Sequence, residues 1–231
     1  MVDFSEFEKK IKIPFKDKDL LTQAFIHRSY INENPKSPLS HNERLEYLGD
    51  AVLELIVTDY LYKKYPHSPE GELTAYRSAL VNANIIAEVA GELGVNDYML
   101  LSKGEAKDIG KARQYILANA YEAIVGAIYL DQGYDAAKMF ITDFLLDKTD
   151  DIVSNKLWQD AKSLIQEKAQ EYVSITPSYK VMHESGPDHD KRFTVGLYLK
   201  DELVAEGKGK SKQEAEQKAA QEALKAKKWD K

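Results

Sequence analysis

The chain has 231 residues, 43% hydrophobic and 30% charged, with a net charge of −6 and no cysteine. The absence of cysteine excludes disulfides, thiolate nucleophiles and cysteine zinc sites, so any metal must bind oxygen or imidazole. No apolar run reaches the length of a membrane span, and the first residues lack the apolar core of a signal peptide, which predicts a cytoplasmic protein. The lysines gather toward the C-terminus, so the acidic total does not exclude binding to nucleic acid.

The first 150 residues carry the periodicity of helices. Apolar residues recur at intervals near 3.6 in residues 20–30, 43–65, 70–93, 113–130 and 134–146, and no alternating strand pattern competes with them. We therefore expect an all-α domain over residues 1–150. Residues 151–158 are expected to form a polar linker.

Residues 159–229 follow a different pattern. A helix is predicted over 160–172, strands over 178–184, 192–200 and 202–208, and a helix over 212–227. Phe193, Val195, Leu197 and Leu199 alternate as in a half-buried strand. The sequence thus predicts a small α+β domain in the order α-β-β-β-α.

Three acids share one face of the predicted helix over 43–65. With Glu43 at zero and about 100° per residue, Glu46 lies near −60° and Asp50 near −20°, opposite the apolar stripe. Like charges at this spacing repel one another, so the helix gains nothing from them unless a cation binds there. The alternative is an ordinary solvated acidic face.

Only two polar residues, Asn119 and Glu122, interrupt the apolar run from 115 to 130. A buried carboxylate needs a partner, which is either a metal or a neighbouring polar or basic side chain. Together the two helices suggest a cluster of Glu46, Asp50, Asn119 and Glu122. Four oxygen donors without histidine or thiolate favour Mg²⁺, with Mn²⁺ as a substitute.

Four sequence motifs resemble ribonuclease III: HNERLEYLGDAVL (41–53), FIHRSY (25–30), EGELT (70–74) and ILANAYEAIVGAIYLD (116–131). The resemblance covers essentially the whole chain. It implies a dimeric helical nuclease domain that hydrolyses phosphodiesters of double-stranded RNA with Mg²⁺, leaving 5′-phosphate and 3′-hydroxyl ends. It further implies the processing of structured precursors of rRNA and mRNA.

The resemblance also implies roles for individual residues. Asp50 and Glu122 match the catalytic acids, and Glu46, Asp50, Asn119 and Glu122 match the metal ligands. Further acidic site positions correspond to Glu43 and Glu70. Tyr47 matches an aromatic residue that enters the partner subunit, although an ordinary tyrosine would look the same. His27 and His41 are interpreted as structural.

Asn119 departs from the family pattern, which most often has aspartate there. Its amide oxygen can coordinate a metal but brings no negative charge, so we expect weaker Mg²⁺ binding or an altered metal preference. The alternative function is therefore a catalytically impaired protein that binds double-stranded RNA. A third hypothesis is a helical interaction module with merely solvated acids.

The second domain resembles a double-stranded-RNA-binding domain through GPDHDKRF (186–193) and GKGKSKQEAEQKAA (207–220). Such domains recognise A-form shape across the minor groove. The expected RNA-binding residues are of three kinds: polar residues of the first helix, a loop histidine, and the residues before the last helix, which suit phosphates. They are Gln166, Glu167, His189, Lys208, Lys210, Ser211 and Lys212. A solvated lysine-rich surface is the alternative.

Overall fold

The computed structural model describes residues 3–108, 110–155, 158, 160–187 and 191–229. The chain divides into two compact units, Met1–Trp158 and Gln159–Lys231. Among the described residues, no helix is long and apolar enough to cross a membrane. The expected fold class, a helical domain followed by a small α+β domain, is confirmed.

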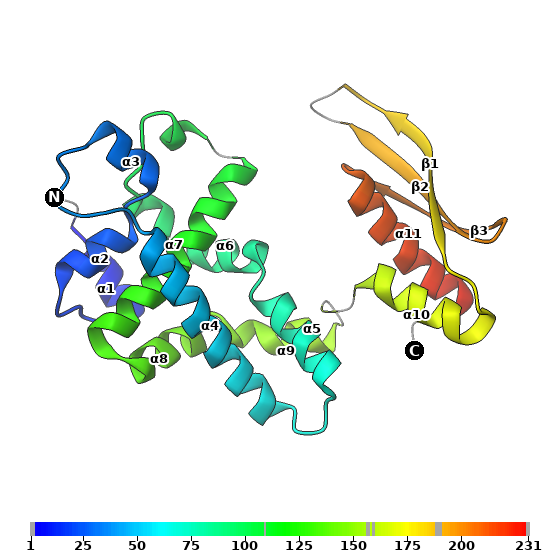
Figure 1. Ribbon diagram of the computed structural model, residues 1–231, viewed down its shortest axis with the longest axis horizontal. Helices are drawn as coiled ribbons and strands as arrows, with labels where there is room; N and C mark the ends of the chain where they lie inside the picture. The colour runs from blue at the N-terminus through cyan, green and yellow to red at the C-terminus, as the bar shows by residue number, and fades with distance from the viewer. Residues whose placement is uncertain (1–2, 109, 156–157, 159, 188–190, 230–231) are drawn as a thin grey trace. The chain divides into compact units, whose positions relative to one another are not determined.

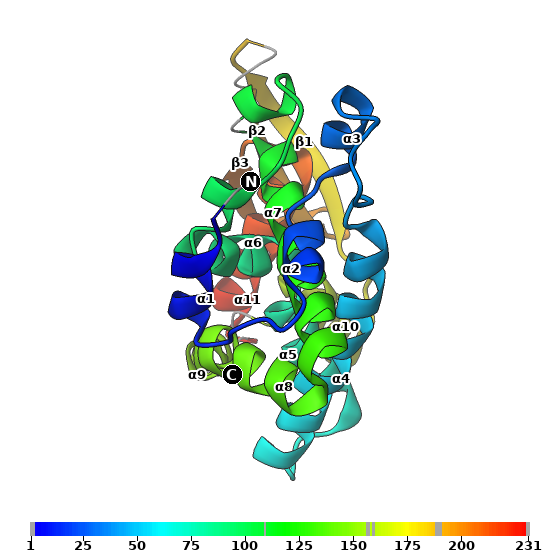
Figure 2. The same ribbon diagram turned by 90° about the vertical axis from the view of Figure 1, so that its left-hand side faces the viewer.

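The first unit is built around one central helix. Its α-helices are α1 (Ser5–Ile11), α2 (Lys18–Ala24), α3 (Arg28–Glu33), α4 (Glu43–Lys64), α5 (Glu70–Leu80), α6 (Ala83–Glu92), α7 (Lys111–Gln132), α8 (Tyr134–Phe144) and α9 (Thr149–Ser154). Helix α7 is packed by α2, α4, α6 and α8, and Figure 2 shows it between α4 and α6. Most of its middle turns are buried, as the apolar run predicts.

Two predicted helices are each divided in the structure. Asn82 ends the expected helix over 70–93, because its side-chain oxygen accepts hydrogen bonds from the backbone N–H groups of Asn84 and Ile85 and so caps α6. The expected helix over 20–30 is broken after α2, where His27 N–H donates to the carbonyl of Leu100 and Leu100 N–H donates to that of Phe25. These partners are distant in sequence, so local periodicity could not predict the break.

The linker prediction for residues 151–158 is wrong in its first half. Residues up to Ser154 belong to α9, and Ile152 is buried in the core of the first unit. Trp158 also packs onto this core, with its ring centroid 4.8 Å from that of Tyr76 in an edge-on arrangement. The short polar stretch is therefore attached to the helical unit through its few apolar side chains.

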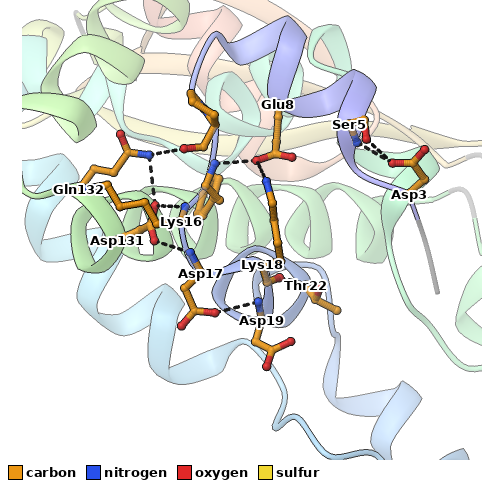
Figure 3. Close-up of polar contacts among 12 residues, drawn as sticks. Asp3, Ser5, Glu8, Lys16, Asp17, Lys18, Asp19, Thr22, Asp131 and Gln132 are labelled. Carbon is orange, nitrogen blue, oxygen red and sulfur yellow. Dashed lines mark hydrogen bonds and ion pairs between the residues drawn. The ribbon is translucent and has the colours of Figure 1, made fainter.

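A polar network joins the N-terminal segment to the end of α7 (Figure 3). The carboxylate of Asp131 accepts hydrogen bonds from the backbone N–H groups of Lys16 and Asp17 at 2.9 and 2.8 Å. Gln132 donates to the carbonyl of Pro14 at 2.8 Å. These contacts hold α2 against α7, the helix that carries two of the expected metal ligands.

The second unit contains α10 (Ala161–Val173), β1 (Ser178–Ser185), β2 (Arg192–Leu199), β3 (Glu202–Gly209) and α11 (Lys212–Lys227). The strands form one antiparallel sheet in the order β1-β2-β3, drawn in yellow and orange in Figure 1. Val195, Leu197 and Leu199 are buried, as their alternation predicts. The face of α11 carrying Ala219, Ala220 and Ala223, together with α10, completes this core.

Candidate active site

Helices α4 and α7 cross with their backbones in contact at two glycines. A Cβ atom on Gly49 would lie 1.7 Å from the carbonyl oxygen of Glu122, and one on Gly126 would lie 2.2 Å from that of Leu45. Only hydrogen at both positions permits this approach. The crossing point lies beside Glu46 and Asp50 on one helix and beside Glu122 on the other.

Glu46 and Asn119 connect the two helices through their side chains. The Glu46 carboxylate accepts a hydrogen bond from the Asn119 amide, and both residues are half-buried. Burial raises the pKa of Glu46, and the nearby charges of Glu43 and Asp50 raise it further, while the bond from Asn119 opposes the shift. The amide thus compensates part of the repulsion within an acidic cluster.

Glu122 is the most strongly perturbed acid of this cluster. Its partial burial, with the charges of Asp50 and Glu46, raises its pKa to about 7. In the described part of the chain, no ion pair to a lysine, arginine or histidine involves Glu46, Asp50 or Glu122. The buried salt bridge considered as an alternative for Glu122 is therefore not observed, and no basic side chain among the described residues pairs with the three carboxylates.

The side chains as they stand do not form a closed metal cage. Among the described residues, no group of three or more His, Asp or Glu is arranged to hold a metal ion. Asp50 is exposed on α4, whereas Glu122 is half-buried on α7. The four expected ligands therefore share one region, but their carboxylates are spread over it.

The second unit presents its cations where β3 meets α11. A Cβ atom on Gly207 would lie 2.2 Å from the carbonyl oxygen of Ala215, so strand and helix touch there. Lys208, Lys210 and Lys212 are exposed around this junction, and the Lys212 ammonium lies 5.8 Å from the ring centroid of Phe193. Lys210 and Lys212 thus lie exposed at the start of α11, and Lys208 is exposed near the end of β3.

Two family models match the two units separately. Residues 17–149 match a model described as ribonuclease-III-like, and residues 161–227 match the double-stranded RNA binding motif. The ribonuclease 3 of Borreliella burgdorferi is 47% identical over 223 residues, covering 96% of this chain and 90% of the relative. That of Nitratiruptor is 43% identical over 225 residues, covering 97% of each chain.

The chain belongs to the ribonuclease III family. It is therefore an endoribonuclease that acts on double-stranded RNA, with a nuclease domain and a double-stranded-RNA-binding domain. Two solved structures of the ribonuclease III nuclease domain from Campylobacter jejuni are also similar. They are 39% and 38% identical, with TM-scores of 0.57 and 0.58; the matches cover 63% and 64% of this chain and 97% of each of those chains.

The family resemblance also suggested Glu43, Glu70 and Tyr47, and the structure places these three residues in different surroundings. Glu43 is exposed at the start of α4, 3.6 Å from Arg28, and contributes to the shift of Glu46. Glu70, at the start of α5, lines a separate pocket of about 290 Å³ with Tyr62 and Arg77. Tyr47 is 83% exposed, so it is not a core residue of this unit.

His27 has a structural contact, whereas His41 lies beside Glu43 of the candidate site. His27 caps α3, because its Nδ1 atom accepts a hydrogen bond from the backbone N–H of Ser29. The start of α4 is fixed by Asn42, a buried residue whose amide donates to the carbonyl of Ala24 at 3.0 Å. His41 lies 3.8 Å from Glu43 through Nδ1. These contacts orient the segment that leads into the acidic helix.

All but one of the expected RNA-binding residues lie in the part of the chain that the structure describes. Gln166 and Glu167 are exposed on α10, and Ser211 caps α11 by accepting a hydrogen bond from the backbone N–H of Glu214. Glu214 in turn accepts from the backbone N–H of Lys210, the residue before this cap, at 2.8 Å, which ties the loop to the first turn of α11. His189 lies outside the described residues.

Sequence reasoning missed three structural contributors to these sites. Gly49 and Gly126 set the distance between the helices that carry the acids, and Glu214 anchors the basic loop. The glycines interrupt two apolar helical runs, a pattern that marks close backbone approach. The spacing of Ser211 and Glu214 is that of a capping box and could have been recognised.

Proposed function

We propose that the chain hydrolyses phosphodiesters of double-stranded RNA with Mg²⁺ at the α4–α7 crossing, leaving 5′-phosphate and 3′-hydroxyl ends. The observation that carries this proposal is the cluster of Glu46, Asp50 and Glu122, which lacks a cationic partner among the described residues. Half-buried carboxylates without a counter-ion are costly, and a divalent cation would remove that cost. Mn²⁺ is expected to substitute for Mg²⁺.

The donor set suits a hard cation. Carboxylate and amide oxygens are the preferred ligands of Mg²⁺, and Glu46, Asn119 and Glu122 already lie on facing helices. Asp50 is exposed and free to rotate toward a cation. The side chains would have to rearrange to bring the four oxygens together on one cation, since no metal-holding group is formed among the described residues as they stand.

Each residue of the acidic cluster has its own proposed role in the hydrolysis. A bound divalent cation lowers the pKa of a coordinated water and offsets charge on the phosphate oxygens. Glu46, Asn119 and Glu122 would hold the cation, and Asp50 would position or deprotonate the attacking water. The amide of Asn119 would keep its hydrogen bond to Glu46 and so fix the orientation of that carboxylate. Glu43, at the rim, would contribute charge to the site.

We further propose a homodimer in which each subunit cuts one strand. A region of the related Campylobacter nuclease domain is involved in dimer formation, and the exposed Tyr47 is the expected contact with the partner subunit. Glu70 would contribute to the site only in such an assembly, because it lies apart from the cluster in this chain. The cytoplasm, where structured precursors of rRNA and mRNA are transcribed, is the proposed location.

For the second unit we propose that Lys208, Lys210 and Lys212 bind phosphates, and that the backbone at Ser211 also contacts a phosphate. Gln166 and Glu167 on α10 are proposed to contact 2′-hydroxyl groups in the minor groove. The exposed lysines around the β3–α11 junction support this assignment. His189 remains a sequence-based expectation.

End-labelled duplex RNA incubated with and without Mg²⁺ or Mn²⁺ tests the proposal. We expect metal-dependent cuts on both strands, lost in Glu122→Gln with duplex binding preserved. The matched control is Asp143→Asn, which removes an exposed acid of α8 far along the chain from the cluster. Equal cleavage by the wild type and Glu122→Gln would refute the site, whereas a bound but intact duplex under all conditions would favour the non-cutting alternative.

Asn119 is tested by its aspartate variant. If the missing charge limits the site, Asn119→Asp will bind Mg²⁺ more tightly, as seen from calorimetry and from a larger rise in melting temperature on adding metal. Cleavage should then require less Mg²⁺. If both proteins bind Mg²⁺ with the same affinity, the neutral amide does not weaken the site.

A further inference from the structure

The exposed edge of α7 carries a row of four residues that leads to the carboxylate cluster. Lys111, Tyr115, Asn119 and Glu122 follow one another at intervals of four, four and three residues, which places them on one side of the helix. With Asn119 at zero and about 100° per residue, Tyr115 lies near −40° and Glu122 near −60°. We call this row the α7 ridge.

Tyr115 is the unexplained member of the α7 ridge. It is 61% exposed, although its neighbours Ile116 and Ala118 are buried. No side-chain hydrogen bond or ring contact within the described residues involves the phenol of Tyr115. By contrast, the exposed Tyr172 of the second unit packs against Trp229. A large aromatic side chain is therefore left free about 6 Å along the helix axis from Asn119.

We propose that Tyr115 contacts the RNA strand beside the scissile phosphate, with its phenol hydrogen-bonded to a ribose 2′-hydroxyl. The inference rests on the proposed cleavage at the carboxylate cluster, because Tyr115 lies about one turn of α7 from Asn119 on the same side of the helix. It adds to that proposal a residue that recognises ribose next to the reacting bond.

The chemistry of the ridge suits an RNA strand. The phenol both donates and accepts hydrogen bonds, as does the 2′-hydroxyl, and 2′-hydroxyl groups line the shallow minor groove of A-form RNA. Lys111, exposed one turn before Tyr115, offers a cation for the next phosphate. The ridge thus places a cation, a phenol and the proposed metal ligands in the order in which a strand would meet them.

The test pairs a protein variant with a chemically altered substrate. Wild type, Tyr115→Phe and the control Gln114→Ala, which alters an exposed neighbour on another side of α7, are assayed in single-turnover cleavage of a duplex RNA with one cut site. A series of duplexes carries a single 2′-deoxy substitution at successive nucleotides near the cut. Thermal melting checks that the three proteins are equally stable.

We expect Tyr115→Phe to slow cleavage about 2- to 10-fold, the effect of one lost hydrogen bond, with Gln114→Ala unchanged. One 2′-deoxy position should slow the wild type by a similar factor and have no further effect in Tyr115→Phe. Full activity of Tyr115→Phe, or identical deoxy effects in both proteins at every position, would overturn the inference.

The outcome is separable from that of the proposed function. If the wild type does not cut with Mg²⁺ or Mn²⁺, cleavage at the cluster fails as a proposal. The same variants and deoxy-substituted duplexes are then compared in equilibrium binding. A binding loss that is shared between Tyr115→Phe and one deoxy position supports the contact, and its absence refutes it.

Discussion

Replacing Gly49 by alanine should separate the two helices on which the nuclease site depends. The new Cβ atom would lie 1.7 Å from the carbonyl oxygen of Glu122, and a tolerable distance begins near 3.0 Å, so α4 and α7 must move apart by about 1.3 Å. The obstructing atom belongs to backbone and cannot rotate away. Overpacking of this kind costs about 1–3 kcal/mol or more, against a gain of about 0.5–1 kcal/mol from alanine in a helix.

We therefore expect Gly49→Ala to lower the free energy of unfolding of the helical unit by about 2 kcal/mol. Displacement of a reacting group by about 1 Å can cost about 100-fold in rate, so cleavage should fall by a similar factor. Urea unfolding followed by circular dichroism, at fixed protein concentration, measures the first effect, and single-turnover cleavage measures the second.

Gly91→Ala is the matched control. Gly91 lies within α6, and a Cβ atom there would meet no atom within 4 Å. This variant should be more stable than the wild type by about 0.5–1 kcal/mol, with unchanged cleavage. If Gly49→Ala is as stable and active as Gly91→Ala, the close helix crossing does not position the site.

Three further predictions concern charge, a buried phenol and RNA affinity. The pKa of Glu122 is raised to about 7 from 4.5, so the metal-free protein should lose stability as the pH rises through that window. In urea titrations, Glu122→Gln should therefore be more stable than the wild type by about 2 kcal/mol at pH 8, after allowing for solvent screening. At pH 4 the two proteins should be equally stable. Tyr121→Phe should gain about 1 kcal/mol in the same assay, since the buried Tyr121 hydroxyl finds no hydrogen-bond partner among the described residues. Lys210→Ala with Lys212→Ala should weaken duplex binding and flatten the logarithmic salt dependence by about one unit per lost phosphate contact.

A specific result would contradict each of these three predictions. Parallel pH profiles for Glu122→Gln and the wild type would show that Glu122 keeps an ordinary pKa. A destabilised Tyr121→Phe would mean that the hydroxyl has a partner in solution. An unchanged salt slope in the double lysine variant would place the phosphate contacts elsewhere.

The sequence by itself determined the kinds of elements and the chemical types in the site. The periodicity near 3.6 in the first 150 residues predicted helices, and the alternation from Phe193 to Leu199 predicted a strand, because side-chain burial repeats with the geometry of each element. Glu46 and Asp50 were placed on one face from spacing alone. The two polar residues in the apolar run of α7, Asn119 and Glu122, supplied the other oxygen donors, and the motifs added the family.

Tertiary structure decided the features that depend on residues far apart in the chain. The break after Phe25 requires Leu100, and the raised pKa of Glu122 requires its burial in the packed unit together with the nearby acids of α4. Neither can be derived from local patterns, because each arises from contact between separate elements. The distance between the two acidic helices is likewise set where Gly49 meets the backbone of α7, which no spacing within a single helix can reveal.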